Sequence, residues 1–77
     1  MNEQRSSHRG YDIVASAHGI EPGPFMARFS IWEPDTSPPE RVHLADVPGD
    51  FPGIRGAIDA AIAAAKTFID ELVDRRQ

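Results

Sequence analysis

Only one segment of this 77-residue chain has a helical repeat, and this limits what the rest of the chain can fold into. Within residues 54–74, apolar side chains recur at spacings of three and four, a pattern that predicts an amphipathic helix. Six alanines between Ala57 and Ala65 add helix propensity and keep the helix thin, so that it can lie close to a sheet. Because one helix covers only one side of a sheet, we expect the other side to be uncovered.

Three segments before the helix are predicted to be strands: residues 11–18, residues 25–32 and about residues 41–47. The first two alternate between apolar and other side chains, and their apolar faces consist of Tyr11, Ile13, Ala15 and Ala17, and of Phe25, Ala27, Phe29 and Ile31. In the third segment the alternation does not decide which face points inward. The expected fold is α+β (βββα), a three-stranded antiparallel meander with one C-terminal helix packed on one face.

The remaining segments are interpreted as connections and a tail. Residues 19–24 and 33–40 are rich in glycine or proline, and residues 48–53 form a tight connection into the helix. Residues 1–9 are polar without apolar periodicity, so we expect a disordered N-terminal tail. The predicted folded unit is then a single domain of residues 10–77.

The small size of the chain favours self-association. A domain of 8.5 kDa without cysteine has no disulfide to stabilise it, and it buries too little surface to be more than marginally stable alone. We therefore expect a homodimer, with an unidentified protein as a further partner. The chain contains no apolar run long enough to cross a membrane and no signal-peptide core. We therefore expect no membrane partner, and we expect a cytoplasmic location.

The uncovered side of the sheet is the predicted interface, with Val14, Met26, Arg28 and Trp32 as its candidate residues. Aromatic, methionine and arginine side chains are enriched at interface centres. Arg41 and His43 are expected to add to this side from the third strand. A second interpretation of Trp32 stays open, in which it lies at the strand end and packs on the proline-rich loop.

Charge makes nucleic acid an improbable partner. Residues 10–53 carry seven acidic residues against Arg28 and Arg41, a net charge of −5, whereas phosphate binding needs clustered basic residues. The whole chain carries −4.

The sequence offers no catalytic, cofactor or metal site, and we do not expect an enzyme. The three histidines lack metal-ligand spacing, and no cysteine is present. Ser16 and Ser30 could lie near a histidine on the open sheet, but neither sits in a nucleophile elbow.

One resemblance covers most of residues 10–73. It is carried by the alternation Phe25-x-Ala27-x-Phe29-x-Ile31, by Gly49-Asp50-Phe51, and by the alanine-rich stretch from Ala57 to Asp70. With these features the chain resembles small bacterial strand-strand-strand-helix proteins of uncharacterised function, and more distantly it is similar to the partial double-stranded-RNA-binding-like fold of HicB-type antitoxins. For HicB-type proteins, the resemblance implies binding to a small toxin ribonuclease. The function expected first is a non-catalytic interaction module that self-associates, and the alternative is an antitoxin-like or RNA-binding regulatory module.

Overall fold

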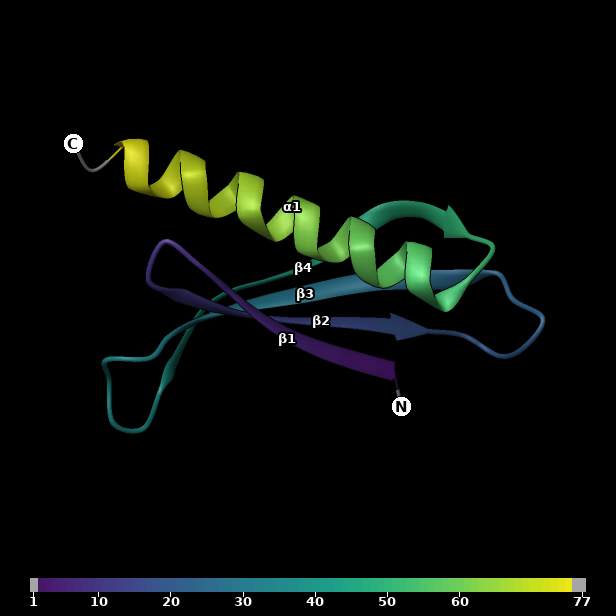
Figure 1. The fold of residues 1–77 in the computed structure, drawn as a ribbon, viewed down its shortest axis with the longest axis horizontal. Helices are drawn as coiled ribbons and strands as arrows, with labels where there is room; N and C mark the ends of the chain where they lie inside the picture. Colours follow the sequence, from purple (N-terminus) through teal and green to yellow (C-terminus); the bar gives the residue numbers. More distant parts are fainter. Residues whose placement is uncertain (1, 76–77) are drawn as a thin grey trace.

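The computed structural model describes residues 2–75 and consists of an antiparallel sheet with one helix lying across it (Figure 1). Its elements are β1 (Asn2–His8), β2 (Tyr11–His18), β3 (Phe25–Glu33), β4 (Glu40–Phe51) and α1 (Ile54–Arg75). Each strand pairs with the next along the chain, so the sheet order is β1-β2-β3-β4. The expected α+β class with a C-terminal helix is confirmed, but the expected count of three strands is wrong because the sheet has four.

The additional strand is β1, which lies in the segment expected to be a disordered tail. Residues 2–8 pair antiparallel with β2, from Asn2 opposite Ala17 to His8 opposite Tyr11. The two strands are joined by Arg9 and Gly10, with φ angles of 50° and 87°. Two successive positive φ angles are typical of the two-residue hairpin turns whose twist matches that of paired strands. The backbone ladder needs no apolar side chain, so a polar strand could form without an alternating hydrophobic pattern.

The core lies entirely between α1 and one face of the sheet. Both apolar strand faces predicted from the sequence are buried there, together with a stripe on the helix. The buried hydrophobic residues are Tyr11, Ile13, Ala15, Ala17, Phe25, Ala27, Phe29, Ile31, Ala57, Ile58, Ala61, Ala65 and Ile69. Pro52 and Gly53 separate the end of the last strand from the helix. The first helical hydrogen bond joins the amide of Ala57 to the carbonyl of Gly53 at 3.2 Å.

Strand β4 is longer than predicted because it continues through residues 48–51, which were expected to belong to a tight connection into the helix. Phe51 pairs with Phe25 after a register shift, and Gly49 has a φ of 102°. A proline removes one ladder donor, which is tolerated at the edge of a sheet or at a bulge, and β4 is an edge strand. The strand therefore bends at Pro48 and Gly49 instead of ending there.

Candidate functional site

The face of the sheet that points away from α1 is the candidate site. In a strand, alternate residues point to opposite faces, and paired residues on neighbouring strands share a face. No helix lies against this face in the part of the chain that the structure describes (Figure 1). We call it the open face, and its paired residues are Glu3, Arg5, Ser7, Asp12, Val14, Ser16, His18, Met26, Arg28, Ser30, Trp32, Arg41, Leu44 and Asp46.

All four interface residues predicted from the sequence lie on the open face. Met26 is the most exposed of its apolar side chains, at 53%, and the Arg28 side chain is about half exposed. Val14 and Trp32 are partly buried. Strand β4 adds Leu44, which is 45% exposed. The face therefore displays apolar side chains that no other part of residues 2–75 covers.

His43 does not lie on the open face, and this sequence-based expectation is wrong. The ring of His43 stacks on Phe68 of α1 with centroids 3.9 Å apart and an interplanar angle of 11°. The ring centroid of Phe29 lies 5.9 Å from it. The pairing of Ile31 with His43 and of Ser30 with Leu44 fixes this orientation. A register shift between Ile31 and Trp32 then brings Arg41 opposite Trp32, so Arg41 does share the open face as expected.

Two serines on the open face each bond to the ring two residues further along the same strand. The Trp32 indole Nε1 donates to the Ser30 hydroxyl at 2.8 Å, and the Ser16 hydroxyl lies 2.9 Å from His18 Nε2. Among residues 2–75, no carboxylate bonds the other His18 nitrogen. Because β2 is an inner strand, its backbone amides pair with β1 and β3 and offer no oxyanion site. The serine bonds orient the two rings along the open face.

The charges of the open face balance. Arg5, Arg28 and Arg41 supply three positive charges, and Glu3, Asp12 and Asp46 supply three negative ones.

Of these six charged side chains, only Arg28 and Asp46 form an ion pair with each other within the described chain. Arg28 Nε donates to Asp46 Oδ1 at 2.7 Å, straight across the β3–β4 ladder. This hydrogen bond holds the pKa of Asp46 below its ordinary value. Arg5, Glu3 and Asp12 form no ion pair with any residue of the range 2–75.

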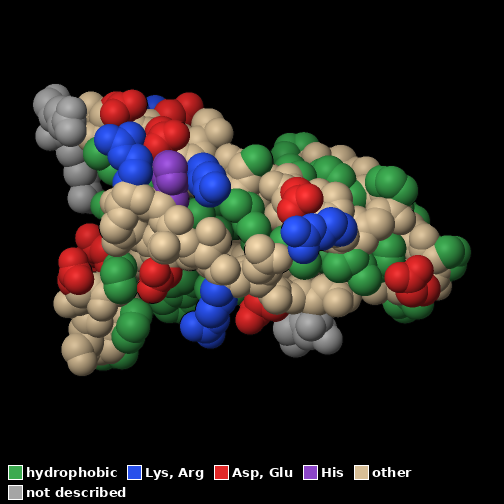
Figure 2. Space-filling model, viewed as in Figure 1, with side chains coloured by type: hydrophobic (Ala, Val, Ile, Leu, Met, Phe, Trp, Pro, Cys, Tyr) green, Lys and Arg blue, Asp and Glu red, His purple; other side chains and the backbone are tan. Residues whose placement is uncertain are grey.

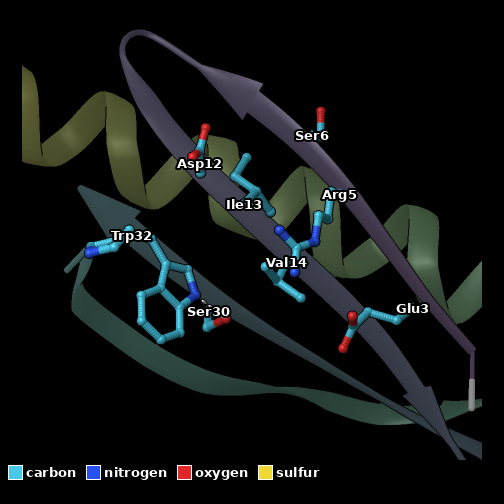
Figure 3. Close-up of a pocket in the computed structure, with 9 residues that line it drawn as sticks. Glu3, Arg5, Ser6, Asp12, Ile13, Val14, Ser30 and Trp32 are labelled. Atoms are coloured by element: carbon cyan, nitrogen blue, oxygen red, sulfur yellow. Dashed lines mark hydrogen bonds between the residues drawn. The ribbon is translucent and has the colours of Figure 1, made fainter. Parts of the chain in front are cut away.

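A hollow of about 570 Å³ opens on one end of this face. Figure 3 shows Arg5 reaching from β1 across Val14, with the Trp32 indole on the far side and Glu3 and Asp12 at the rim. Pro39, from the loop between β3 and β4, also lines the hollow. Trp32 was interpreted either as part of the interface or as packing on the proline-rich loop. The two interpretations are compatible, because the ring lies on the open face and lines the same hollow as Pro39 of that loop. The residues that line the hollow are Glu3, Arg5, Ser6, Asp12, Ile13, Val14, Ser30, Trp32 and Pro39.

A second charged cluster lies on the opposite side, where the β1–β2 turn meets the C-terminal half of α1 (Figure 2, left). Asp70 Oδ1 accepts hydrogen bonds from His8 Nε2 at 2.8 Å and from Arg9 at 3.1 Å. These contacts lower the pKa of Asp70, the His8 bond being the larger cause. The cluster fastens the β1 hairpin to the helix. Nowhere in residues 2–75 do three or more metal-ligating side chains gather.

No protein-family model matches the chain, and comparisons with curated proteins and with solved structures find no match either. Across residues 2–75, α1 is not apolar enough to pass through a bilayer.

Sequence reasoning missed the contribution of β1, above all Glu3 and Arg5. Their alternation with neutral polar residues has no hydrophobic contrast, so strand periodicity could not be recognised. The available signal was Arg9-Gly10 directly before an alternating segment, since a polar residue followed by glycine is typical of a hairpin turn.

Proposed function

We propose that this protein is a small, non-catalytic interaction module that self-associates through its open face. The observation that carries the proposal is the one-sided core. Among residues 2–75, every buried hydrophobic residue lies between α1 and the sheet, whereas Met26 and Leu44 on the open face are 53% and 45% exposed. Apolar side chains that stay exposed on one whole side of a sheet favour an interaction surface there. We include the cytoplasmic location in the proposal, on the cysteine-free composition.

A second copy of the chain is the occupant that the charges favour. In a two-fold dimer the same surface meets itself, so a face of net positive or net negative charge would repel its copy. The open face has equal numbers of arginines and acidic residues, although the chain as a whole carries −4. Single-stranded RNA, in contrast, binds best to a face with a surplus of basic residues.

The size of the open face fits a dimer that dissociates on dilution. Four strands about 4.8 Å apart and about eight residues long, at about 3.3 Å per residue, present a face of roughly 20 by 25 Å. Two such faces bury about 1,000 Å² or slightly more, the lower end of the range for specific interfaces. We therefore expect a weak dimer that dissociates on dilution.

Sedimentation equilibrium over a hundredfold concentration range tests the proposal, with the emission of Trp32 followed in parallel. Trp32 is the only tryptophan, so the emission reports on the open face alone. We expect a dimer at high concentration and a red shift of the emission as it dissociates. A monomer with constant emission over the whole range would contradict the proposal.

Leu44→Glu separates loss of the interface from loss of the fold. The introduced carboxylate would lose its contact with water inside the interface, so we expect at least tenfold weaker association. Ala63→Glu is the matched control, because Ala63 lies on the exposed side of α1, away from the sheet. Both variants should keep the helical circular-dichroism signal. Equal association of Leu44→Glu and the unmodified chain would show that the open face is not the interface. Salt-sensitive binding of single-stranded RNA by a monomer would favour the regulatory alternative instead.

A further inference from the structure

The open face has a projection at one end and a hollow at the other. Met26 is exposed near the start of β3. Trp32 lines the hollow near the end of the same strand (Figure 3). The two positions are six residues apart along the strand, which corresponds to about 20 Å. The projecting side chain and the hollow therefore cannot meet within one chain, but they can meet between two.

We propose that two copies pack open face to open face about a two-fold axis that runs across the strands, so that each Met26 enters the hollow of the other copy beside its Trp32. This inference rests on the proposed self-association and specifies its geometry. A methionine is suited to such a contact, because its flexible thioether fills irregular space and contacts aromatic rings favourably. The strands of the two sheets would remain aligned, as in other face-packed sheets.

The unpaired charges indicate the same axis. In the sheet, Glu3, Ser16, Arg28 and Asp46 lie in one row across the strands, and Arg5, Val14, Ser30 and Leu44 lie in the next. An axis between these rows places Glu3 opposite Arg5 of the second copy. The same operation places His18 opposite Asp12 of the second copy. Three of the four groups, Glu3, Arg5 and Asp12, have no ion-pair partner within the described chain.

The alternative axis, along the strands, fits less well. It exchanges β1 with β4 and β2 with β3, so Glu3 would face Asp46 of the second copy. Two carboxylates would then lie opposite each other at both symmetry-related contacts, which disfavours association. Met26 would face His18 of the second copy, outside the hollow.

A charge exchange between two positions tests the axis. In Arg5→Glu and in Glu3→Arg, like charges meet at both Glu3–Arg5 contacts of the homodimer, so we expect each variant alone to associate about tenfold more weakly. Mixing the two variants restores opposite charges at both contacts of the mixed dimer. We therefore expect the mixture to associate as tightly as the unmodified chain, and the double variant Glu3→Arg/Arg5→Glu to do the same.

The outcomes distinguish this inference from the proposed function. If the unmodified chain dimerises but the mixture associates no more tightly than the separate variants, the axis is wrong and the open-face dimer stands. If the unmodified chain does not dimerise, both fail. Circular dichroism of each variant verifies that it is folded.

A fluorescent label tests the contact between Met26 and Trp32 directly. The chain has no cysteine, so Met26→Cys provides a single thiol for bimane, which tryptophan quenches only at short range. Because Trp32 of the same chain is about 20 Å away, quenching that rises with protein concentration must come from the second copy. We expect such quenching, and its loss in Met26→Cys/Trp32→Phe. A labelled dimer without quenching would overturn the contact.

Discussion

Small residues determine how closely the helix approaches the sheet. Ala57, Ala61 and Ala65 have no exposed surface and form a line along the inner side of α1. Larger side chains at these positions would hold the helix axis further from β2 and β3. The interior of a protein is packed as densely as an organic crystal, so little space is available for additional atoms there.

The first prediction concerns this line of alanines. Ala61→Leu should destabilise the fold by about 1–3 kcal/mol, because the three added carbons must be accommodated in a closed contact. Ala63→Leu makes the same chemical change on the exposed side of the helix and should leave the stability nearly unchanged, since leucine and alanine have similar helix propensities. Urea unfolding of the two variants measures the difference. Equal midpoints would show that the helix does not pack tightly at Ala61.

The strands differ in how much of their structure could be predicted, and the reason lies in what each face contacts. For β2 and β3, the apolar faces were predicted correctly because those faces contact the helix, and burial selects hydrophobic residues. Strand β1 was missed because its inner side contacts α1 mainly through polar groups such as His8. In β4, hydrophobicity did not show which face is buried, because the apolar Leu44 is exposed and the polar His43 contacts the helix. The four candidate interface residues followed from alternation on β2 and β3, whereas Arg5 required the register of a strand that was not predicted.

The second prediction concerns the turn that positions β1. Gly10 has a φ of 87°, and a Cβ atom added there would meet no other atom within 4 Å, so only backbone strain opposes a side chain. Gly10→Val should therefore cost about 1–2 kcal/mol, whereas Gly10→Asn should cost much less because asparagine tolerates this conformation. Hydrogen exchange of the β1 and β2 amides measures the effect. Similar protection in the two variants would contradict the proposed role of this turn.

The whole molecule is thin for its mass. Its dimensions are 43 × 25 × 15 Å, and its accessible surface of 5038 Å² exceeds the value of about 4,700 Å² expected for a compact chain of 8.5 kDa. Its two layers expose one whole side of the sheet. A molecule of this shape gains more from pairing with a second copy than a spherical one does, because pairing adds a second covered face without enlarging either core.

The third prediction concerns acid stability. The pKa of Asp70 lies below 3.8 because of hydrogen bonds from His8 and Arg9, and the pKa of Asp46 lies below 3.8 because of Arg28. Folding thus favours the charged carboxylates, and their stabilising effect is complete above about pH 4 and is lost as the pH falls through the lowered values. We expect the melting temperature to drop below pH 4. In Asp70→Asn and Asp46→Asn the drop should be smaller, since one titrating group is removed. Thermal unfolding between pH 2 and pH 7 checks this, and an unchanged acid profile in both variants would contradict it.

The separation of each strand into a core face and an open face also has an evolutionary consequence. Substitutions at Met26, Arg28 or Leu44 leave the packing beneath the helix untouched, because these side chains lie on the opposite side of the sheet from the core. Selection can therefore alter the binding preference of the sheet through single substitutions while the fold keeps its stability. In the proposed dimer, a charge exchange at Glu3 and Arg5 would give a duplicated copy of the chain that pairs with itself and no longer with the original.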